Sequence, residues 1–170
     1  SGGDYPFKSI GGGDGMQVQV DWRDNKTVYT GYQFGNYMRT NTARSVRVGT
    51  PESKTSEANT VEGDEDTQTT LRIHPQNDLG EPQLRYNWQS PIVLSRHNQD
   101  VLYFGSNKFH RSLRKGAKME TLSDDLTTNP TQGDVPFGSL TTITESALKF
   151  GLVYVGTDDG NVHITKDGGY

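Results

Sequence analysis

The sequence predicts an all-β fold built from small, separate antiparallel sheets. One pattern occurs three times: a hydrophobic residue, tyrosine, one further residue and glycine, followed by a polar turn and a second short strand. The copies lie at 28–31, 102–105 and 153–156, and their second strands lie at 36–40, 108–112 and 161–165. An internal repeat of β-hairpins on this scale predicts a repeat architecture such as a β-propeller.

Each repeat unit is expected to hold four strands, which we name inner, second, third and outer. Residues 16–20 alternate between hydrophobic and polar side chains, as a half-buried strand does, and they are expected to form the first inner strand. The matching inner strands are expected at 91–94 and 140–144. Outer strands are expected at 45–48 and 118–122, and no amphipathic helix is apparent.

The spacing of the repeated tyrosines gives the size of one unit. Tyr29, Tyr103 and Tyr154 are 74 and 51 residues apart, and the first interval contains an acidic, threonine-rich segment. Without that segment both intervals fit roughly 40–50 residues, the size of a four-stranded propeller blade. The segment is therefore expected to be an insertion that forms a surface loop.

We expect a partial β-propeller of about three four-stranded blades. The expected division is an outer strand of a preceding blade at 1–10, a blade at 11–50, the insertion at 51–86, a blade at 87–130 and an incomplete blade at 131–170. Because known propellers hold more blades, the chain is interpreted as a fragment. The rest of its own polypeptide or other subunits would then complete the propeller.

Composition agrees with short strands and limits the classes of function. Only 30% of the 170 residues are hydrophobic, and 20 are glycine, which fits sheets in which turns take up many residues. Cysteine is absent, which excludes disulfides and thiolate chemistry and suits a secreted, periplasmic or cell-surface bacterial protein. No segment is long and apolar enough for a membrane-spanning helix, so membrane insertion is not expected.

The net charge of −4 comes from one segment. Residues 51–66 hold six acidic side chains and one lysine, and the remainder of the chain is nearly neutral. A nucleic-acid partner is not expected, because there is no basic surface to meet a phosphate backbone. Asp64 and Asp66 are candidate Ca²⁺ ligands by their oxygen atoms, but the segment lacks the full EF-hand pattern and a solvated acidic loop is the commoner explanation. No metal site and no cofactor are predicted.

The third repeat ends in a turn that resembles the Asp-box, Ser/Thr-x-Asp-x-Gly. In such a turn the aspartate accepts backbone N–H groups and the glycine adopts backbone angles that other residues avoid. Thr165, Asp167 and Gly169 hold the motif positions. Ser112 and Gly116 hold the matching places in the second repeat, where an arginine replaces the aspartate.

Together these features resemble the BNR/Asp-box β-propeller family. The resemblance is carried by residues 87–95, 102–112, 123–127 and 154–162, together with the Asp-box-like turn. It is nearest to bacterial secreted proteins with sortilin-type or sialidase-like repeats, the glycosyl hydrolase-like branch. The resemblance implies an Asp-box propeller, but members include sialidases, xyloglucanases, peptide-binding sortilins and assembly factors, so it implies no single activity.

Propeller ligands usually meet the face formed by two sets of loops. One set joins an outer strand to the next inner strand, here 11–15, 86–89 and 133–138; the other joins second and third strands, here 32–36, 106–108 and 157–161. The candidate ligand-binding residues on these loops are Tyr32, Gln33, Asn87, Trp88, Asn107 and Asp159. Aromatic side chains there suit stacking on sugar rings or peptide side chains, although packing of Trp88 between blades is an alternative.

Asp14 and Asp158 are the candidate catalytic residues. Asp14 lies in a glycine-rich loop, and Asp158 lies in a turn that holds a catalytic aspartate in the xyloglucanase-like branch, which the resemblance extends to this chain. Each carboxylate suits a general acid or base, and each also suits the capping of a turn. The function expected is an extracytoplasmic module that binds protein, peptide or glycan or serves as a scaffold. A glycoside hydrolase with paired carboxylates is the alternative.

Overall fold

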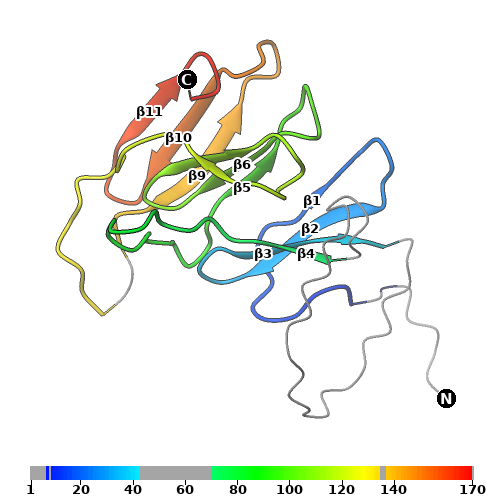
Figure 1. Cartoon of the computed structure of the whole chain (residues 1–170), viewed down its shortest axis with the longest axis horizontal. Coiled ribbons are helices and arrows are strands. Elements are labelled where there is room, and N and C mark those ends of the chain that lie inside the picture. Colours follow the sequence, from blue (N-terminus) through cyan, green and yellow to red (C-terminus); the bar gives the residue numbers. More distant parts are fainter. Residues whose placement is uncertain (1–6, 8, 43–69, 135–136, 170) are drawn as a thin grey trace.

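The computed structural model describes residues 7, 9–42, 70–134 and 137–169, which form three separate antiparallel sheets (Figure 1). The first sheet has the order β1 (Gln19–Val20), β2 (Thr27–Tyr32), β3 (Asn36–Asn41), β4 (Thr70–Ile73). The second has the order β5 (Ile92–Leu94), β6 (Leu102–Gly105), β7 (Phe109–Ser112), β8 (Glu120–Thr121). The third has the order β11 (Val162–Thr165), β10 (Val153–Thr157), β9 (Leu140–Glu145).

The predicted all-β character is confirmed, and the described residues contain no helix. Each repeated tyrosine lies in the second strand of its own sheet: Tyr29 in β2, Tyr103 in β6 and Tyr154 in β10. Each inner strand pairs with the tyrosine strand, as Val93 does with Tyr103. The described part of the chain accordingly has no helix able to cross a bilayer.

The outer strand of the first sheet differs from the prediction. The strand that pairs with β3 is β4, with Ile73 opposite Tyr37 and Leu71 opposite Arg39. The segment 45–48, where this strand was expected, lies outside the described residues. Strand β4 lies instead within 51–86, the expected insertion, because burial of Ile73 against the first core favours this short alternating segment at the edge of the sheet.

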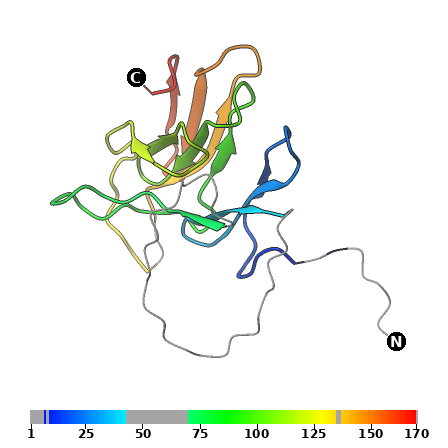
Figure 2. The ribbon, with the colours of Figure 1, turned by 45° about the vertical axis from the view of Figure 1, so that its right-hand side comes forward.

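The sheets stack face to face through two hydrophobic cores. Between the first and second sheets lie Tyr29, Tyr37, Ile73, Ile92, Leu94, Leu102 and Phe104. Between the second and third sheets lie Val101, Tyr103, Phe109, Leu140, Ile143, Val153 and Val155. The second sheet is covered on both faces, so neighbouring residues of β6 point into different cores, as strand geometry requires. It lies between the other two sheets in both views of the ribbon (Figures 1 and 2).

A repeated hydrogen bond joins consecutive sheets. Arg39 Nη1 of the first sheet donates to the carbonyl of Lys115, and Arg111 Nη1 of the second sheet donates to the carbonyl of Gly168, both at 3.1 Å. The two arginines hold equivalent places in β3 and β7. The two carbonyls hold equivalent places in the turns that follow β7 and β11, so the contact between neighbouring sheets repeats in register.

The glycine after each of these carbonyls lies against the preceding sheet. Gly116 and Gly169 have φ values of 85° and 98°, which favour glycine. A Cβ at Gly116 would lie 2.6 Å from Cδ1 of Ile73, and one at Gly169 would lie 2.9 Å from Cδ1 of Leu122. Both positions therefore need glycine for the backbone angle and for the close approach of the sheets.

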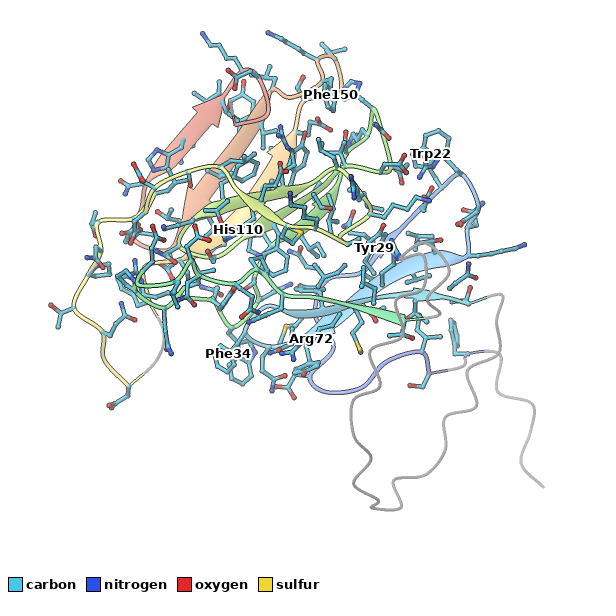
Figure 3. The ribbon with its side chains drawn as sticks, viewed as in Figure 1. Trp22, Tyr29, Phe34, Arg72, His110 and Phe150 are labelled. Atoms are coloured by element: carbon cyan, nitrogen blue, oxygen red, sulfur yellow. The ribbon has the colours of Figure 1, made fainter. Side chains whose placement is uncertain are left out.

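The strands of all three sheets run between two ends of the molecule, and different turns lie at each end; these are the two ends of the stack. Phe34, in the turn between β2 and β3, lies on one side of the molecule, and Trp22 and Phe150, beside the turns of the inner hairpins, lie on the other (Figure 3). Tyr29 and His110 lie between them in the interior (Figure 3). The inner strands are neighbours, since β1 contacts β5 and β5 contacts β9.

The two core tyrosines differ in their hydrogen bonds. Tyr103 Oη donates to Oε1 of the buried Glu145 at 2.9 Å. The position equivalent to Glu145 at the first interface is Leu94, which pairs with Leu102 as Glu145 pairs with Val153. Tyr29 Oη is buried and has no hydrogen-bond partner among the described residues.

Replacement of each tyrosine by phenylalanine is expected to have different effects. Tyr103→Phe should lower the free energy of unfolding by about 1–3 kcal/mol, because it leaves the buried Glu145 carboxylate short of a donor. Tyr29→Phe should leave stability unchanged or raise it, since its hydroxyl is buried without a partner. Urea denaturation of the two variants measures the difference, and equal losses for both would contradict the assigned hydrogen bonds.

Candidate functional site

The predicted ligand-facing loops gather at one end of the stack. Adjacent antiparallel strands reverse direction, so the turns β2–β3, β6–β7 and β10–β11 lie at the same end as the connections β4–β5 and β8–β9. We call the described residues of these turns and connections, together with 11–15, the loop face. Hydrogen bonds join the turns of this face to the connections between sheets.

Arg85 links three parts of the loop face. Its backbone N–H donates to Asn107 Oδ1 at 2.9 Å, and its Nε donates to the Gly138 carbonyl at 3.0 Å. Its Nη2 donates to Asp125 Oδ2 at 2.6 Å and to Thr127 Oγ1 at 2.9 Å. The guanidinium thus forms its hydrogen bonds and its ion pair within the protein, and it offers no free charge for a carboxylate ligand.

Asp125 and Asn107 complete this cluster. Asn107 Nδ2 donates to Asp125 Oδ2 at 3.0 Å. Burial raises the pKa of Asp125, but hydrogen bonds from Thr127, Arg85 and Asn107 outweigh burial and hold that pKa below its ordinary value. Asn107 therefore fastens the β6–β7 turn to both neighbouring connections, and its amide is engaged in structure.

Asp158 is also engaged through both oxygens. Oδ1 accepts the backbone N–H groups of Gly138 at 2.8 Å and Ser139 at 3.0 Å. Oδ2 accepts Asn87 Nδ2 at 3.2 Å and Ser139 Oγ at 3.1 Å. Four donors meet one carboxylate, so Asp158 fastens the β10–β11 turn to the connections on either side of the second sheet, and Asn87 takes part in the same anchor.

Asp159 anchors the other side of the same turn. Its Oδ2 accepts the backbone N–H of Thr128 at 2.5 Å and the Thr128 hydroxyl at 2.7 Å, and its Oδ1 accepts the Thr157 hydroxyl. Burial raises the pKa of Asp159, but the hydrogen bonds from Thr157 and Thr128 outweigh it and lower that pKa. The turn is held in one conformation by carboxylate contacts on both flanks.

Asp14 is the candidate carboxylate with an exposed side chain. Oδ2 of Asp14 accepts Nε2 of Gln33 at 3.1 Å, which joins the glycine-rich loop to the β2–β3 turn. The preceding Gly13 has a φ of 83°, and a Cβ there would lie 2.6 Å from Cβ of Tyr32. The structure therefore brings Asp14 of the loop 11–15 together with Tyr32 and Gln33 of the loop 32–36.

The half-exposed Trp88 and the partly buried Phe34 form an aromatic platform on the loop face. The rings of Phe34 and Trp88 meet edge to face at a centroid distance of 5.1 Å, and the Phe34 backbone N–H donates to the Trp88 carbonyl at 3.2 Å. Trp88 is 50% exposed. It packs on the turn of the first sheet and keeps half of its surface open, so it is available for stacking.

An open cavity of about 410 Å³ adjoins this platform. It is lined by Phe34, Leu84, Arg85, Tyr86, Gln132, Gly133 and Asp134. Tyr86 is one of these lining residues, and its hydroxyl donates to the Pro75 carbonyl at 2.6 Å. Phe34 was not predicted from the sequence. Its φ of 61° beside Gly35 places it in a tight turn that projects its ring.

The Asp-box-like turns lie at the end of the stack away from the loop face. Ser112 Oγ accepts the backbone N–H groups of Arg114 at 3.1 Å and Gly116 at 3.0 Å. Thr165 Oγ1 donates to Asp167 Oδ1 at 2.7 Å and accepts the Gly169 N–H at 2.9 Å. In both turns the hydroxyl at the first motif position accepts the N–H of the glycine four residues later, so the two turns close in the same way.

Metal binding and a nucleophile paired with histidine are two other chemistries that the side chains could offer. They contain no group of three or more histidine, aspartate or glutamate side chains able to hold a metal ion, and Asp64 and Asp66 lie outside them. His110 Nε2 lies 2.7 Å from Ser106 Oγ, but both side chains are fully buried. Burial, with the nearby charges of Lys108 and His74, lowers the pKa of His110 to about 3, so this pair is a neutral structural contact.

Comparison of the chain with protein-family models, curated proteins and solved structures gave no match. Inference about function therefore depends on the chemistry of the loop face itself.

Replacement of each candidate catalytic carboxylate by an amide tests which of the two has a structural role. Asp158→Asn should lower the free energy of unfolding by about 1–3 kcal/mol. The amide nitrogen would replace one carboxylate oxygen and could not accept the hydrogen bonds that this oxygen now accepts. Asp14→Asn, at an exposed position, should change it by less than about 0.5 kcal/mol. Urea denaturation measures both values, and an unchanged stability of Asp158→Asn would contradict its role as an anchor.

Proposed function

We propose that this chain is a glycan-binding module and that the Phe34–Trp88 platform, with the adjoining cavity, is its binding site. The half-exposed Trp88 carries the proposal, because it presents a flat apolar surface on a rigid end of the stack. Gln33, Gln132 and Asp14 lie on the same face, and amide and carboxylate groups suit hydrogen bonds with sugar hydroxyls.

The proposed ligand is a neutral sugar chain. Recognition of an acidic sugar needs unpaired cationic side chains that can hold its carboxylate. Arg85 is the cation of the cavity, and its guanidinium is bound to Asp125, Thr127 and the Gly138 carbonyl. Among the described residues the site therefore has no free cation, and it carries the carboxylates of Asp14 and Asp134, which favours a neutral oligosaccharide over a sialylated one.

We further propose that the three sheets are consecutive blades of a partial β-propeller of the BNR/Asp-box family. The neighbouring inner strands β1, β5 and β9 support this, as do the Arg39 and Arg111 contacts that repeat between sheets. Further blades, from the rest of its own polypeptide or from other subunits, would complete the propeller. The absence of cysteine and the family resemblance support a secreted, periplasmic or cell-surface location.

Binding has more support than hydrolysis. A glycosidase of the usual kind needs two carboxylates that flank the scissile bond. Asp158 accepts four hydrogen bonds from the protein and Asp159 accepts three, so both are held as turn anchors. Asp14 retains an exposed carboxylate, which suits hydrogen bonding to a bound sugar.

Calorimetric titration with cellohexaose, xylohexaose and chitohexaose tests the binding site. At least one of these neutral probes should bind, and Trp88→Ala should weaken that binding by about tenfold or more through loss of the stacking surface. Trp22→Ala is the matched control, because Trp22 is an exposed tryptophan at the opposite end of the stack (Figure 3). It should bind as the unaltered chain does.

Two results would contradict the proposed function. One is an absence of binding to all three oligosaccharides, and the other is an equal loss of binding in Trp22→Ala and Trp88→Ala. Sialyllactose, titrated in parallel, should bind more weakly than the neutral probes. Release of reducing sugar during the titration, lost in Asp14→Asn, would instead show a hydrolase.

A further inference from the structure

Four turns from the three sheets lie at the end of the stack opposite the loop face. They are the inner hairpin turns of the three sheets and the turn between β7 and β8, at 21–26, 95–100, 146–151 and 113–118. We call these residues the basic face. Trp22 and Phe150 mark it on one side of the molecule (Figure 3).

Polar contacts join the turns of the basic face into one surface. Arg23 Nη2 donates to Asp100 Oδ1 at 2.7 Å, and the backbone N–H of Lys115 donates to the Asp100 carbonyl at 2.8 Å. His97 Nε2 lies 2.8 Å from the Ser146 carbonyl. The turns of all three sheets therefore present their remaining side chains on a connected support.

The charge of the basic face is opposite to that of the loop face. Its turns hold seven lysine and arginine side chains and three aspartates. The described residues of the loop face hold eight carboxylates against Arg85 and Lys108. The two sets alternate along the chain, so no basic surface was apparent from the sequence. Reversal of direction at each antiparallel strand sorts them onto opposite ends.

Four exposed cations of the basic face form no ion pair within the part of the chain that the structure describes. They are Lys26, Arg96, Arg114 and Lys149. Arg23, by contrast, pairs with both Asp21 and Asp100. The unpaired charges favour an anionic partner.

Large apolar side chains lie beside these cations. Leu113 precedes Arg114, and Leu148 and Phe150 flank Lys149. Leu148 is 96% exposed, and Trp22 is 62% exposed. A soluble anion gains little from a leucine at the tip of a turn. A bilayer interface offers phosphates to the cations and acyl chains to the apolar side chains, and tryptophan is enriched at such interfaces.

We propose that the basic face docks on a membrane surface that contains anionic lipids. Trp22, Leu148 and Phe150 enter the headgroup region, and the unpaired cations meet the lipid phosphates. The contact is peripheral and needs no membrane-spanning helix. It goes beyond glycan binding and does not depend on it. The loop face, at the other end of the stack, points away from the lipid and stays open to a sugar chain.

Sedimentation with lipid vesicles tests the docking. The unaltered chain should bind vesicles of phosphatidylcholine and phosphatidylglycerol in equal parts. It should bind phosphatidylcholine alone about tenfold or more weakly, and added salt should release it from the anionic vesicles, because salt screens the attraction. Lys149→Glu should weaken binding to the anionic vesicles about tenfold, since it reverses a charge that faces the lipid phosphates.

Two exposed leucines at opposite ends of the stack test the apolar part of the contact. Leu148→Ser should weaken binding to the anionic vesicles about tenfold, because it removes an apolar side chain from the interface. Leu79→Ser is the matched control, since Leu79 is a fully exposed leucine of the loop face. It should bind as the unaltered chain does.

The two tryptophans report which end meets the lipid. Trp22 and Trp88 are the two tryptophans of the chain, and they lie on the basic face and the loop face. In Trp88→Phe, the emission of Trp22 should shift to shorter wavelength when anionic vesicles are added. In Trp22→Phe, the emission of Trp88 should not change.

Several results would overturn the proposal. They are a failure to bind anionic vesicles, an equal loss of binding in Leu79→Ser and Leu148→Ser, or a shift in the emission of Trp88 in place of Trp22. A DNA duplex that binds as tightly as the vesicles, with no effect of Leu148→Ser, would show a site for polyanions instead. The vesicles hold no oligosaccharide, so these outcomes are separate from those of the glycan titrations.

Discussion

The structure depends on the burial of Tyr29 and Tyr103, the repeated tyrosines of the first two sheets, by the sheet that follows each of them. Sheets of three or four strands with two to six residues each are too small to hold a core alone. Each gains a core only by contact with a neighbour, as in other repeat architectures. The second sheet has neighbours on both faces and is the most completely buried of the three, whereas the first and third each pack against one neighbouring sheet among the described residues.

Neighbouring sheets are held together by contacts at both ends of their strands, and the contacts at one of these ends fix the loop face. Arg39 and Arg111 reach the turn of the next sheet, and Gly116 and Gly169 allow that turn to lie against the preceding one. At the opposite end, Arg85 and Asp158 tie turns to connections from neighbouring sheets. The aromatic platform is therefore attached to a framework that is anchored at both ends, which favours recognition without rearrangement.

Much of the fold could be predicted because its main signal is local and repeated. The hydrophobic–tyrosine–x–glycine pattern located β2, β6 and β10, alternation located the first inner strand, and the position within the repeat located the other two. Strand β4 was missed because its four residues follow a long acidic segment and carry only a short alternation. The loop face followed from strand direction alone, but the use of its side chains did not. The pairing of Arg85 with Asp125 spans forty residues, and nothing in either neighbourhood indicates it.

Amide hydrogen exchange of the monomer, measured in dilute solution, tests most directly whether stacking stabilises the sheets. Strands β6 and β10 are a matched pair, since each is hydrogen-bonded on both sides within its own sheet. They differ in that β6 is covered on both faces and β10 on one. We expect slower exchange in β6 than in β10, because opening β10 disrupts contact with a single neighbouring sheet. Equal protection of the two strands, or greater protection of β10, would contradict stacking as the source of stability.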